Sequence, residues 1–145
     1  MAAAWAYFDT SVLLKRYVRE VGSAQAMALF RRYRLLSSAL APVETASELR
    51  LRQSTGDLAE RVVDRALAKM ATDRARWELI GPTSLVLSRA EELVRAHALR
   101  TLDAVHLASA LIFQAETGRR LRFLTADARQ RTAALRLDLE VVWVG

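Results

Sequence analysis

Four widely spaced acids are the side chains in this sequence best suited to chemistry: Asp9, Glu44, Asp103 and Asp127. Asp103 is the most unusual of them, because it comes just before an almost wholly apolar stretch, residues 104–113. A helix of that composition has no solvated face, so we expect it to be buried, with Asp103 at the mouth of the core. A carboxylate in that place is costly unless it is hydrogen-bonded, paired with a cation or bound to a metal.

The segments that must position these acids alternate between strand and helix. Short apolar or aromatic runs predict strands at residues 5–8, 35–39, 77–80, 121–125 and 140–144. Helical spacing of apolar residues predicts helices at 12–18, 23–34, 42–55, 57–75, 83–97, 102–113 and 128–135. The expected N-caps are Ser23, Asp57, Thr83 and Thr101. This alternation predicts a single α/β domain over residues 1–145, with a mostly parallel central sheet flanked by helices.

The four acids take equivalent positions in that arrangement. Asp9 and Asp127 each follow the carboxyl end of a predicted strand, and Glu44 and Asp103 lie in the first turns of helices. The carboxyl ends of parallel strands share one edge of the sheet, where ligands bind. Carboxylates gathered there repel one another unless protons or a divalent cation compensate. We therefore expect Mg²⁺ or Mn²⁺, which all-oxygen ligand sets favour, and metal-assisted hydrolysis of a phosphodiester.

Each acid also has a simpler interpretation. Asp103 could stabilise a helix start through the helix dipole, Asp9 could form a turn, and Asp127 could cap the helix that follows it. Glu48 lies one turn after Glu44 on the same helical face, so either glutamate could face the pocket. We favour Glu44, because the first turn of the helix lies nearer to the edge of the sheet.

Composition narrows the classes of protein and of site. The chain has 145 residues, is 52% hydrophobic and has no cysteine, which suits one soluble domain and excludes disulfides, thiolate metal sites and cysteine nucleophiles. With only His97 and His106, a multi-histidine zinc site is not expected, and we interpret His106 as a core residue. We see no signal peptide and no membrane span, so the expected compartment is the cytoplasm.

The charge of the chain suits a polyanionic partner. The net charge is +6, and the isoelectric point is near 10.7. A basic surface of this kind attracts nucleic acid. Within the helix predicted at 23–34, Arg31 and Arg32 are our candidate contacts for RNA or for a protein partner.

Four segments of the sequence resemble one family. They are YFDTSVLLKRY at residues 7–17, SALAPVETASELR at 38–50, LRTLDAVHLASAL at 99–111 and FLTADARQ at 123–130. In this order, and over nearly the whole chain, they resemble the PIN-domain ribonucleases, specifically the VapC-type toxins of bacterial toxin–antitoxin pairs. The third segment is the most specific of the four.

The resemblance implies an activity, a cofactor and partners. The residues implied to hold Mg²⁺ or Mn²⁺ are the acidic quartet Asp9, Glu44, Asp103 and Asp127. Hydroxyls close to the metal or the phosphate would come from Thr10, Ser11 and Thr125. The implied substrate is RNA, often a tRNA or another structured RNA, and the implied partners are a cognate VapB-like antitoxin and a second copy of the chain in a homodimer. The chain lacks the glycine that the family often has before the last strand, so its final turn departs from the family pattern.

Three other classes share parts of this pattern. A phosphoacceptor receiver domain needs an acidic pair after the first strand and a lysine near the last, whereas Thr10 follows Asp9 and no lysine lies beyond Lys69. A haloacid-dehalogenase-like phosphatase needs an acid where Ser11 stands. A degenerate PIN domain that binds RNA or a partner without cleavage is the alternative to the nuclease, although all four acids are present.

Overall fold

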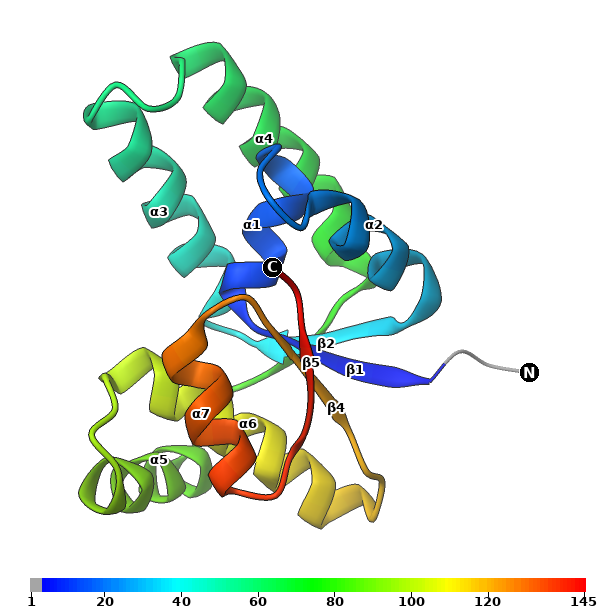
Figure 1. The fold of residues 1–145 in the computed structure, drawn as a ribbon, viewed down its shortest axis with the longest axis vertical. Coiled ribbons are helices and arrows are strands. Elements are labelled where there is room, and N and C mark those ends of the chain that lie inside the picture. The colour runs from blue at the N-terminus through cyan, green and yellow to red at the C-terminus, as the bar shows by residue number, and fades with distance from the viewer. Residues whose placement is uncertain (1–3) are drawn as a thin grey trace.

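The computed structural model describes residues 4–145, in which a parallel β-sheet lies between layers of helices (Figure 1). The strands in this range are β1 (Trp5–Phe8), β2 (Arg34–Ser38), β3 (Glu78–Ile80), β4 (Arg122–Thr125) and β5 (Glu140–Trp143). The helices are α1 (Thr10–Tyr17), α2 (Ser23–Arg32), α3 (Ala41–Ser54), α4 (Glu60–Asp73), the 3₁₀ helix η1 (Arg74–Arg76), α5 (Ser84–Ala96), α6 (Thr101–Thr117) and α7 (Ala128–Arg136). No helix within residues 4–145 is long and apolar enough to cross a membrane.

The strand order places β1 in the middle of the sheet. The order is β3-β2-β1-β4-β5, and each neighbouring pair of these strands is parallel, which confirms the predicted fold class. The chain builds outward from β1 to β2 and β3, and then crosses back to β4 and β5 on the other side. Open parallel sheets bind ligands outside the carboxyl ends of their strands at such a reversal. The segments that leave β1 and β4 at this point carry Asp9 and Asp127.

Alternate side chains of each strand point to opposite faces of the sheet. Tyr7, Leu36 and Phe123 pack in a core with α5, α6 and α7 on one face. Phe8 and Leu124 pack with α1 and α2 on the other face. The helices α3 and α4 pack against α1 in a third cluster. Figure 1 shows the two sets of helices on opposite sides of the sheet.

The helix α6 matches the buried stretch predicted at residues 104–113, except that Leu111, Ile112 and Phe113 are only partly buried. Its residues from Ala104 to Ala110 are all buried, and Asp103 stands just before them in the first turn. The helix ends at Gly118, where φ is +66°. Glycine adopts this left-handed conformation without the strain that a β-carbon would introduce. The buried residues of α6 therefore fix the first turn of the helix, which carries Asp103.

Three of the four predicted N-caps are wrong. Thr83 does cap α5, because its hydroxyl accepts a hydrogen bond from the backbone N–H of Val86 at 3.3 Å. The N-cap positions of α2, α4 and α6 belong instead to Gly22, Ala59 and Arg100. The side chains of Ser23 and Asp57 form hydrogen bonds within the preceding turns, and Thr101 is already helical.

The turn before β5 forms without the glycine that the family often has there. Asp138 takes the left-handed conformation, with φ of +58°, and is the one non-glycine residue with positive φ among residues 4–145. Aspartate tolerates this conformation better than most residues, because its short polar side chain can bond to the local backbone. The departure in sequence is therefore accommodated locally and does not reach the carboxyl edge of the sheet.

Candidate active site

A pocket of about 690 Å³ opens at the carboxyl edge of the sheet, and all four predicted acids line it. Its walls come from the end of β1, the first turns of α1, α3 and α6, and the segment that follows β4. Apolar side chains complete the walls: Leu14, Leu40, Val43 and Leu102. The structure thus brings together acids that are spread over most of the chain.

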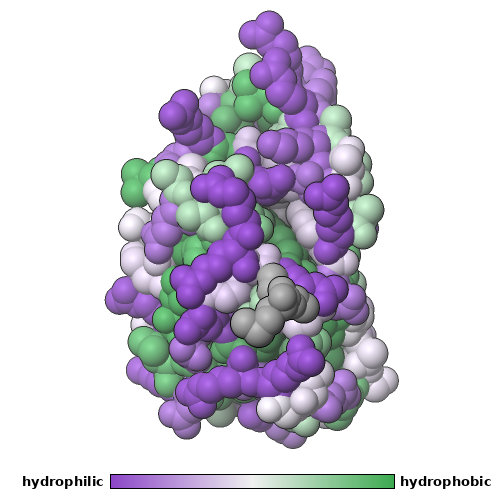
Figure 2. All heavy atoms as spheres, turned by 90° about the vertical axis from the view of Figure 1, so that its right-hand side faces the viewer, coloured by the Kyte–Doolittle hydropathy of each residue, from purple (hydrophilic) through white to green (hydrophobic). Residues whose placement is uncertain are grey.

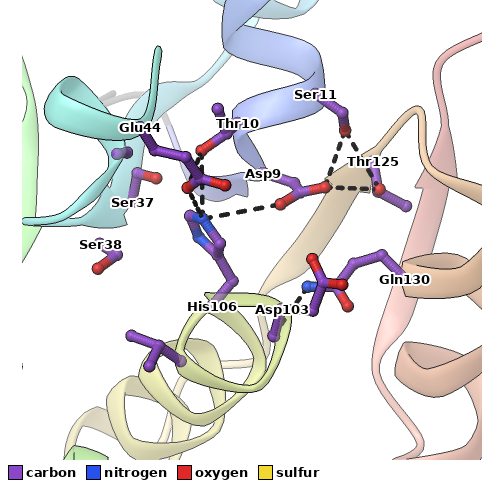
Figure 3. Close-up of polar contacts among 12 residues, drawn as sticks. Asp9, Thr10, Ser11, Ser37, Ser38, Glu44, Asp103, His106, Thr125 and Gln130 are labelled. Carbon is purple, nitrogen blue, oxygen red and sulfur yellow. Dashed lines mark hydrogen bonds and ion pairs between the residues drawn. The ribbon is translucent and has the colours of Figure 1, made fainter. Parts of the chain in front are cut away.

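Asp9 is deeply buried at the centre of this edge, with 4% of its surface exposed. The hydroxyls of Ser11 and Thr125 both donate to its Oδ2, at 2.8 and 2.9 Å (Figure 3). Burial raises the pKa of Asp9, and the nearby His106 and the two hydroxyls oppose this rise only in part. The other oxygen, Oδ1, lies 3.9 Å from Nε2 of His106 and has no hydrogen-bond donor among residues 4–145.

Glu44 reaches the same pocket from α3. The hydroxyl of Thr10 donates to its Oε1 at 2.7 Å, and Nε2 of His106 lies 2.8 Å from the same oxygen. Burial alone would raise the pKa of Glu44, but the hydrogen bonds and the charge of His106 lower it overall. Glu48 also lines the pocket, but its Oε1 accepts from Nε of Arg52 at 3.0 Å. The geometry therefore supports the preference for Glu44.

His106 is buried, as its interpretation as a core residue requires, but its polar contacts are with the site. Its side chain is 1% exposed, and its Nδ1 lies 2.7 Å from the hydroxyl of Tyr7. Burial alone would lower the pKa of His106, but Glu44 and Asp9 raise it overall. Sequence reasoning missed these contacts. The spacing of three residues places His106 beside Asp103 on one helix face, but nothing in the sequence pattern indicates its actual partners.

Asp127 is both a helix cap and a pocket residue. Its Oδ1 accepts hydrogen bonds from the backbone N–H groups of Arg129 and Gln130, at 2.8 and 3.4 Å, and so caps α7. Its Oδ2 takes no part in the cap and lies 3.9 Å from Nη2 of Arg100. The simpler role and the proposed site role therefore use different oxygens of the same carboxylate.

Asp103 and Arg100 face each other at the start of α6. Burial and the charge of Asp9 raise the pKa of Asp103, against the opposing effect of Arg100. Nε of Arg100 lies 3.4 Å from Oδ2 of Asp103, and the arginine side chain is 71% exposed. Among the described residues 4–145, Arg100 is the one basic side chain that lines the pocket. Sequence reasoning did not single it out, because nothing in the pattern distinguished it from the other exposed arginines.

The three hydroxyl residues implied by the resemblance contact the acids. Thr10 and Ser11 line the pocket, and Thr125 is fully buried beside it. Each hydroxyl donates to a carboxylate oxygen, of Glu44 or of Asp9. These hydroxyls therefore fix the acids, and their protons are not available to a phosphate in this arrangement.

The two predicted arginine contacts lie elsewhere. Arg31 and Arg32 end α2, which leads into the amino end of β2 at the edge of the sheet opposite to the pocket. The guanidinium of Arg32 packs over the ring of Tyr33, at 5.2 Å from its centroid. The structure thus separates these two arginines from the acids.

The donor set of the pocket fits a hydrated hard cation. Within residues 4–145, no three carboxylate or imidazole side chains lie close enough together to hold one ion directly. Mg²⁺ usually keeps several waters, so its protein ligands need not all touch it. Three acids have one oxygen held by the chain and a second oxygen that receives no hydrogen bond from the described residues, namely Asp9, Glu44 and Asp127. Oxygen ligands prepared in this way suit Mg²⁺ or Mn²⁺.

Comparison with known proteins identifies the family. Residues 6–136 match the family model of the PIN domain. This chain belongs to the PIN-domain family. It is 40% identical over 106 residues to Ribonuclease VapC45 and to Ribonuclease VapC49 of Mycobacterium tuberculosis, over 72% of this chain and 74% of each relative. It is 35% identical over 137 residues to Ribonuclease VapC46 of the same species, over 94% of this chain and 95% of the relative.

Solved structures share the PIN-domain fold of this chain. A toxin–antitoxin complex from Klebsiella pneumoniae aligns with a TM-score of 0.63 at 16% identity, over 97% of this chain and 98% of the other. VapBC2 from Rickettsia felis, bound to a DNA fragment from the promoter, aligns with a TM-score of 0.65 at 10% identity over the same shares. At these identities the likeness establishes the fold.

Proposed function

We propose that this PIN-domain protein is a metal-dependent endoribonuclease and the toxin of a toxin–antitoxin pair. The 35–40% identity to proteins named ribonuclease VapC supports RNA cleavage. The fold shared with solved toxin–antitoxin complexes is consistent with an antitoxin partner. The observation that carries the metal dependence is the pocket lined by all four acids. In it, one oxygen of Asp9 and one of Glu44 are held by the chain, while the second oxygen of each has no hydrogen bond within the part of the chain that the structure describes.

In this proposal Asp9, Glu44, Asp103 and Asp127 would hold the hydrated ion, in part through its waters. When bound, Mg²⁺ or Mn²⁺ offsets the charge of the scissile phosphate and lowers the pKa of an attacking water. The chain orients the acids for this task through hydroxyls at Asp9 and through backbone N–H groups at Asp127. The raised pKa values of Asp9 and Asp103 mean that their ionised forms gain more from a nearby cation than exposed carboxylates do.

Arg100 is the residue that we propose for contact with the RNA backbone. Its guanidinium is exposed at the pocket and makes long ion pairs with Asp103 and Asp127, at 3.4 and 3.9 Å. Ion pairs of this kind are weak and easily exchanged. A guanidinium that leaves them is well suited to bind a phosphate through paired N–H donors.

The proposed partners are a VapB-like antitoxin, a second copy of the chain, and a tRNA or another structured RNA. Val43 and Leu102 line the pocket and are nevertheless 65% and 40% exposed. Exposed apolar side chains next to a charged pocket suit a protein partner. An antitoxin that covered them would also close access to the acids.

In a host cell, expression of the protein should arrest growth, and coexpression of the cognate antitoxin should restore it.

The test of the proposed activity is cleavage of purified tRNA in EDTA and after Mg²⁺ or Mn²⁺ is restored. We expect cleavage only with metal, and none by Asp103→Asn, whose fold is checked by circular dichroism. Asp57→Asn, at an exposed acid between α3 and α4, is the matched control and should cleave like the wild type. Cleavage by Asp103→Asn at the parent rate would contradict the assignment, and RNA binding without cleavage by the wild type would favour the degenerate PIN domain.

A further inference from the structure

We propose that His106 is a positioning residue that holds one oxygen of Glu44 so that the other is available to the ion. This inference rests on the proposed function, because the ion is what the positioned oxygen would bind. His106 is not among the residues that line the pocket, so it acts through Glu44 and does not touch the RNA.

Two hydrogen bonds converge on Oε1 of Glu44. Nε2 of His106 lies 2.8 Å from this oxygen, and the hydroxyl of Thr10 lies 2.7 Å from it. A carboxylate oxygen only accepts hydrogen bonds, so Nε2 carries a hydrogen and donates it. Thr10 gives its own proton to Glu44 and turns a lone pair toward Nε2, at 3.2 Å. The other oxygen, Oε2, receives no hydrogen bond from residues 4–145.

Tyr7 holds the far side of the imidazole. Its hydroxyl lies 2.7 Å from Nδ1 of His106, and the two rings meet edge to face with centroids 5.7 Å apart. A phenol hydroxyl can donate to Nδ1 or accept from it, so this contact persists in either protonation state of the histidine. The core therefore sets the direction in which Nε2–H points, and Figure 3 shows it aimed at Glu44 and Asp9.

Glu44 needs this support more than Asp9 does. Asp9 directly follows β1 and is almost completely buried, whereas the side chain of Glu44 projects from α3 and is 23% exposed. A partly exposed glutamate samples several rotamers, and ordering it costs free energy when a ligand binds. Partners that hydrogen-bond to a metal-ligating side chain typically contribute about 10- to 100-fold in metal affinity.

The test compares His106→Gln with His106→Asn in calorimetric Mn²⁺ titrations at constant pH. The glutamine amide can place an N–H where Nε2 stands, whereas asparagine is too short to reach Glu44. We expect His106→Gln to keep most of the wild-type affinity and His106→Asn to lose about 10- to 100-fold. His97→Gln, at the other histidine of the chain, is the matched control and should bind like the wild type.

The same change in a Glu44→Gln background separates positioning from a general structural role. If His106 acts through Glu44, His106→Asn should cause no further loss of Mn²⁺ affinity in that background. Tyr7→Phe removes the hydroxyl at Nδ1 with little change in volume. Like His106→Asn, Tyr7→Phe should weaken Mn²⁺ binding in the wild-type background and cause no further loss in the Glu44→Gln background. It serves as the second variant if His106→Asn does not fold.

The outcomes distinguish this inference from the proposed function. A folded His106→Asn protein with wild-type Mn²⁺ affinity would overturn the positioning role. So would a loss of Mn²⁺ affinity of the same size when His106→Asn is introduced into the wild type and into Glu44→Gln. A wild-type protein that binds no Mn²⁺ would overturn the metal site itself, whatever the His106 variants do.

Discussion

The hydroxyl of Thr125 donates to Oδ2 of Asp9 at 2.9 Å, across 116 residues of sequence. Thr125 ends β4 and Asp9 follows β1, so this bond joins the two strands between which the strand order reverses. Both residues are buried, so the bond lies where little solvent reaches it. The sheet therefore holds the central acid of the pocket from two neighbouring strands.

Thr125→Val removes this donor with almost no change in side-chain size. We expect the free energy of unfolding to fall by about 1–3 kcal/mol, because a buried carboxylate oxygen loses one of its two donors. Chemical denaturation measures the change. Thr132→Val on the exposed face of α7 is the matched control and should change stability by less than about 0.5 kcal/mol. Equal losses in the two variants would contradict a special role for the bond between Thr125 and Asp9.

Asp9→Asn should change stability in a pH-dependent way in the presence of EDTA. Below the ordinary aspartate pKa of about 3.9, Asp9 is protonated in the folded and the unfolded states, and asparagine resembles the neutral acid. Because burial raises the pKa of Asp9, the folded state binds more protons than the unfolded state as the pH rises above that value. The wild type therefore loses stability relative to Asp9→Asn between about pH 4 and neutrality.

Melting temperatures of the two proteins in acid and at neutral pH measure this difference. We expect similar values near pH 4 and a higher value for Asp9→Asn near pH 7. Asp64→Asn, at an exposed acid on α4, should show no such trend. If Asp9→Asn were less stable than the wild type by a constant amount at both pH values, the pKa of Asp9 would not be raised in the folded state.

Arg100→Ala should weaken RNA binding and reduce its dependence on salt. Loss of one phosphate contact lowers the slope of log affinity against log salt concentration by about 0.7–0.9. Fluorescence anisotropy across a salt series, in the Asp103→Asn background to prevent cleavage, measures the slope. Arg95→Ala removes an exposed arginine of α5 that pairs with Glu91, and should leave the slope unchanged. The same salt slope for both variants would contradict a contact between Arg100 and the RNA backbone.

Charge reversal at Arg31 and Arg32 tests the surface suggested by the sequence. These residues lie at the opposite edge of the sheet from the acids, so an RNA must be long enough to reach both edges. We expect weaker binding and a flatter salt dependence for a folded tRNA, and no change for a short oligonucleotide. An unchanged salt slope for the tRNA would assign the two arginines to ordinary solvation.

The fold and the gathering of the four acids at one pocket could be predicted from sequence because they follow from patterns along the chain. Apolar periodicity located the strands and helices, and the shared edge of a parallel sheet then placed Asp9 and Asp127 together. The partners of His106 could not be found in this way, because Tyr7 and Glu44 belong to segments that meet it only in the folded protein. Periodicity shows that a residue is buried, but not which polar atoms surround it.

The predictions of the N-cap residues failed for a related reason. A hydroxyl or carboxylate near a helix start has several local partners, and the turn geometry decides among them. Asp57 bonds to Thr55 in the loop before α4 and does not cap the helix. Arg100 was missed because the role proposed for it depends on its exposed position beside Asp103 and Asp127, which a count of basic residues does not reveal.

The most direct test of the metal site is the rise in melting temperature caused by millimolar Mn²⁺ in single-acid variants. Binding to the folded state at a hundredfold excess over Kd stabilises a protein by about 2.7 kcal/mol. We predict a clear rise for the wild type and for Glu48→Gln, one turn further along α3, and a much smaller rise for Glu44→Gln and Asp103→Asn. The same rise in all four proteins would contradict a metal site built from these acids, and with it the metal-dependent nuclease.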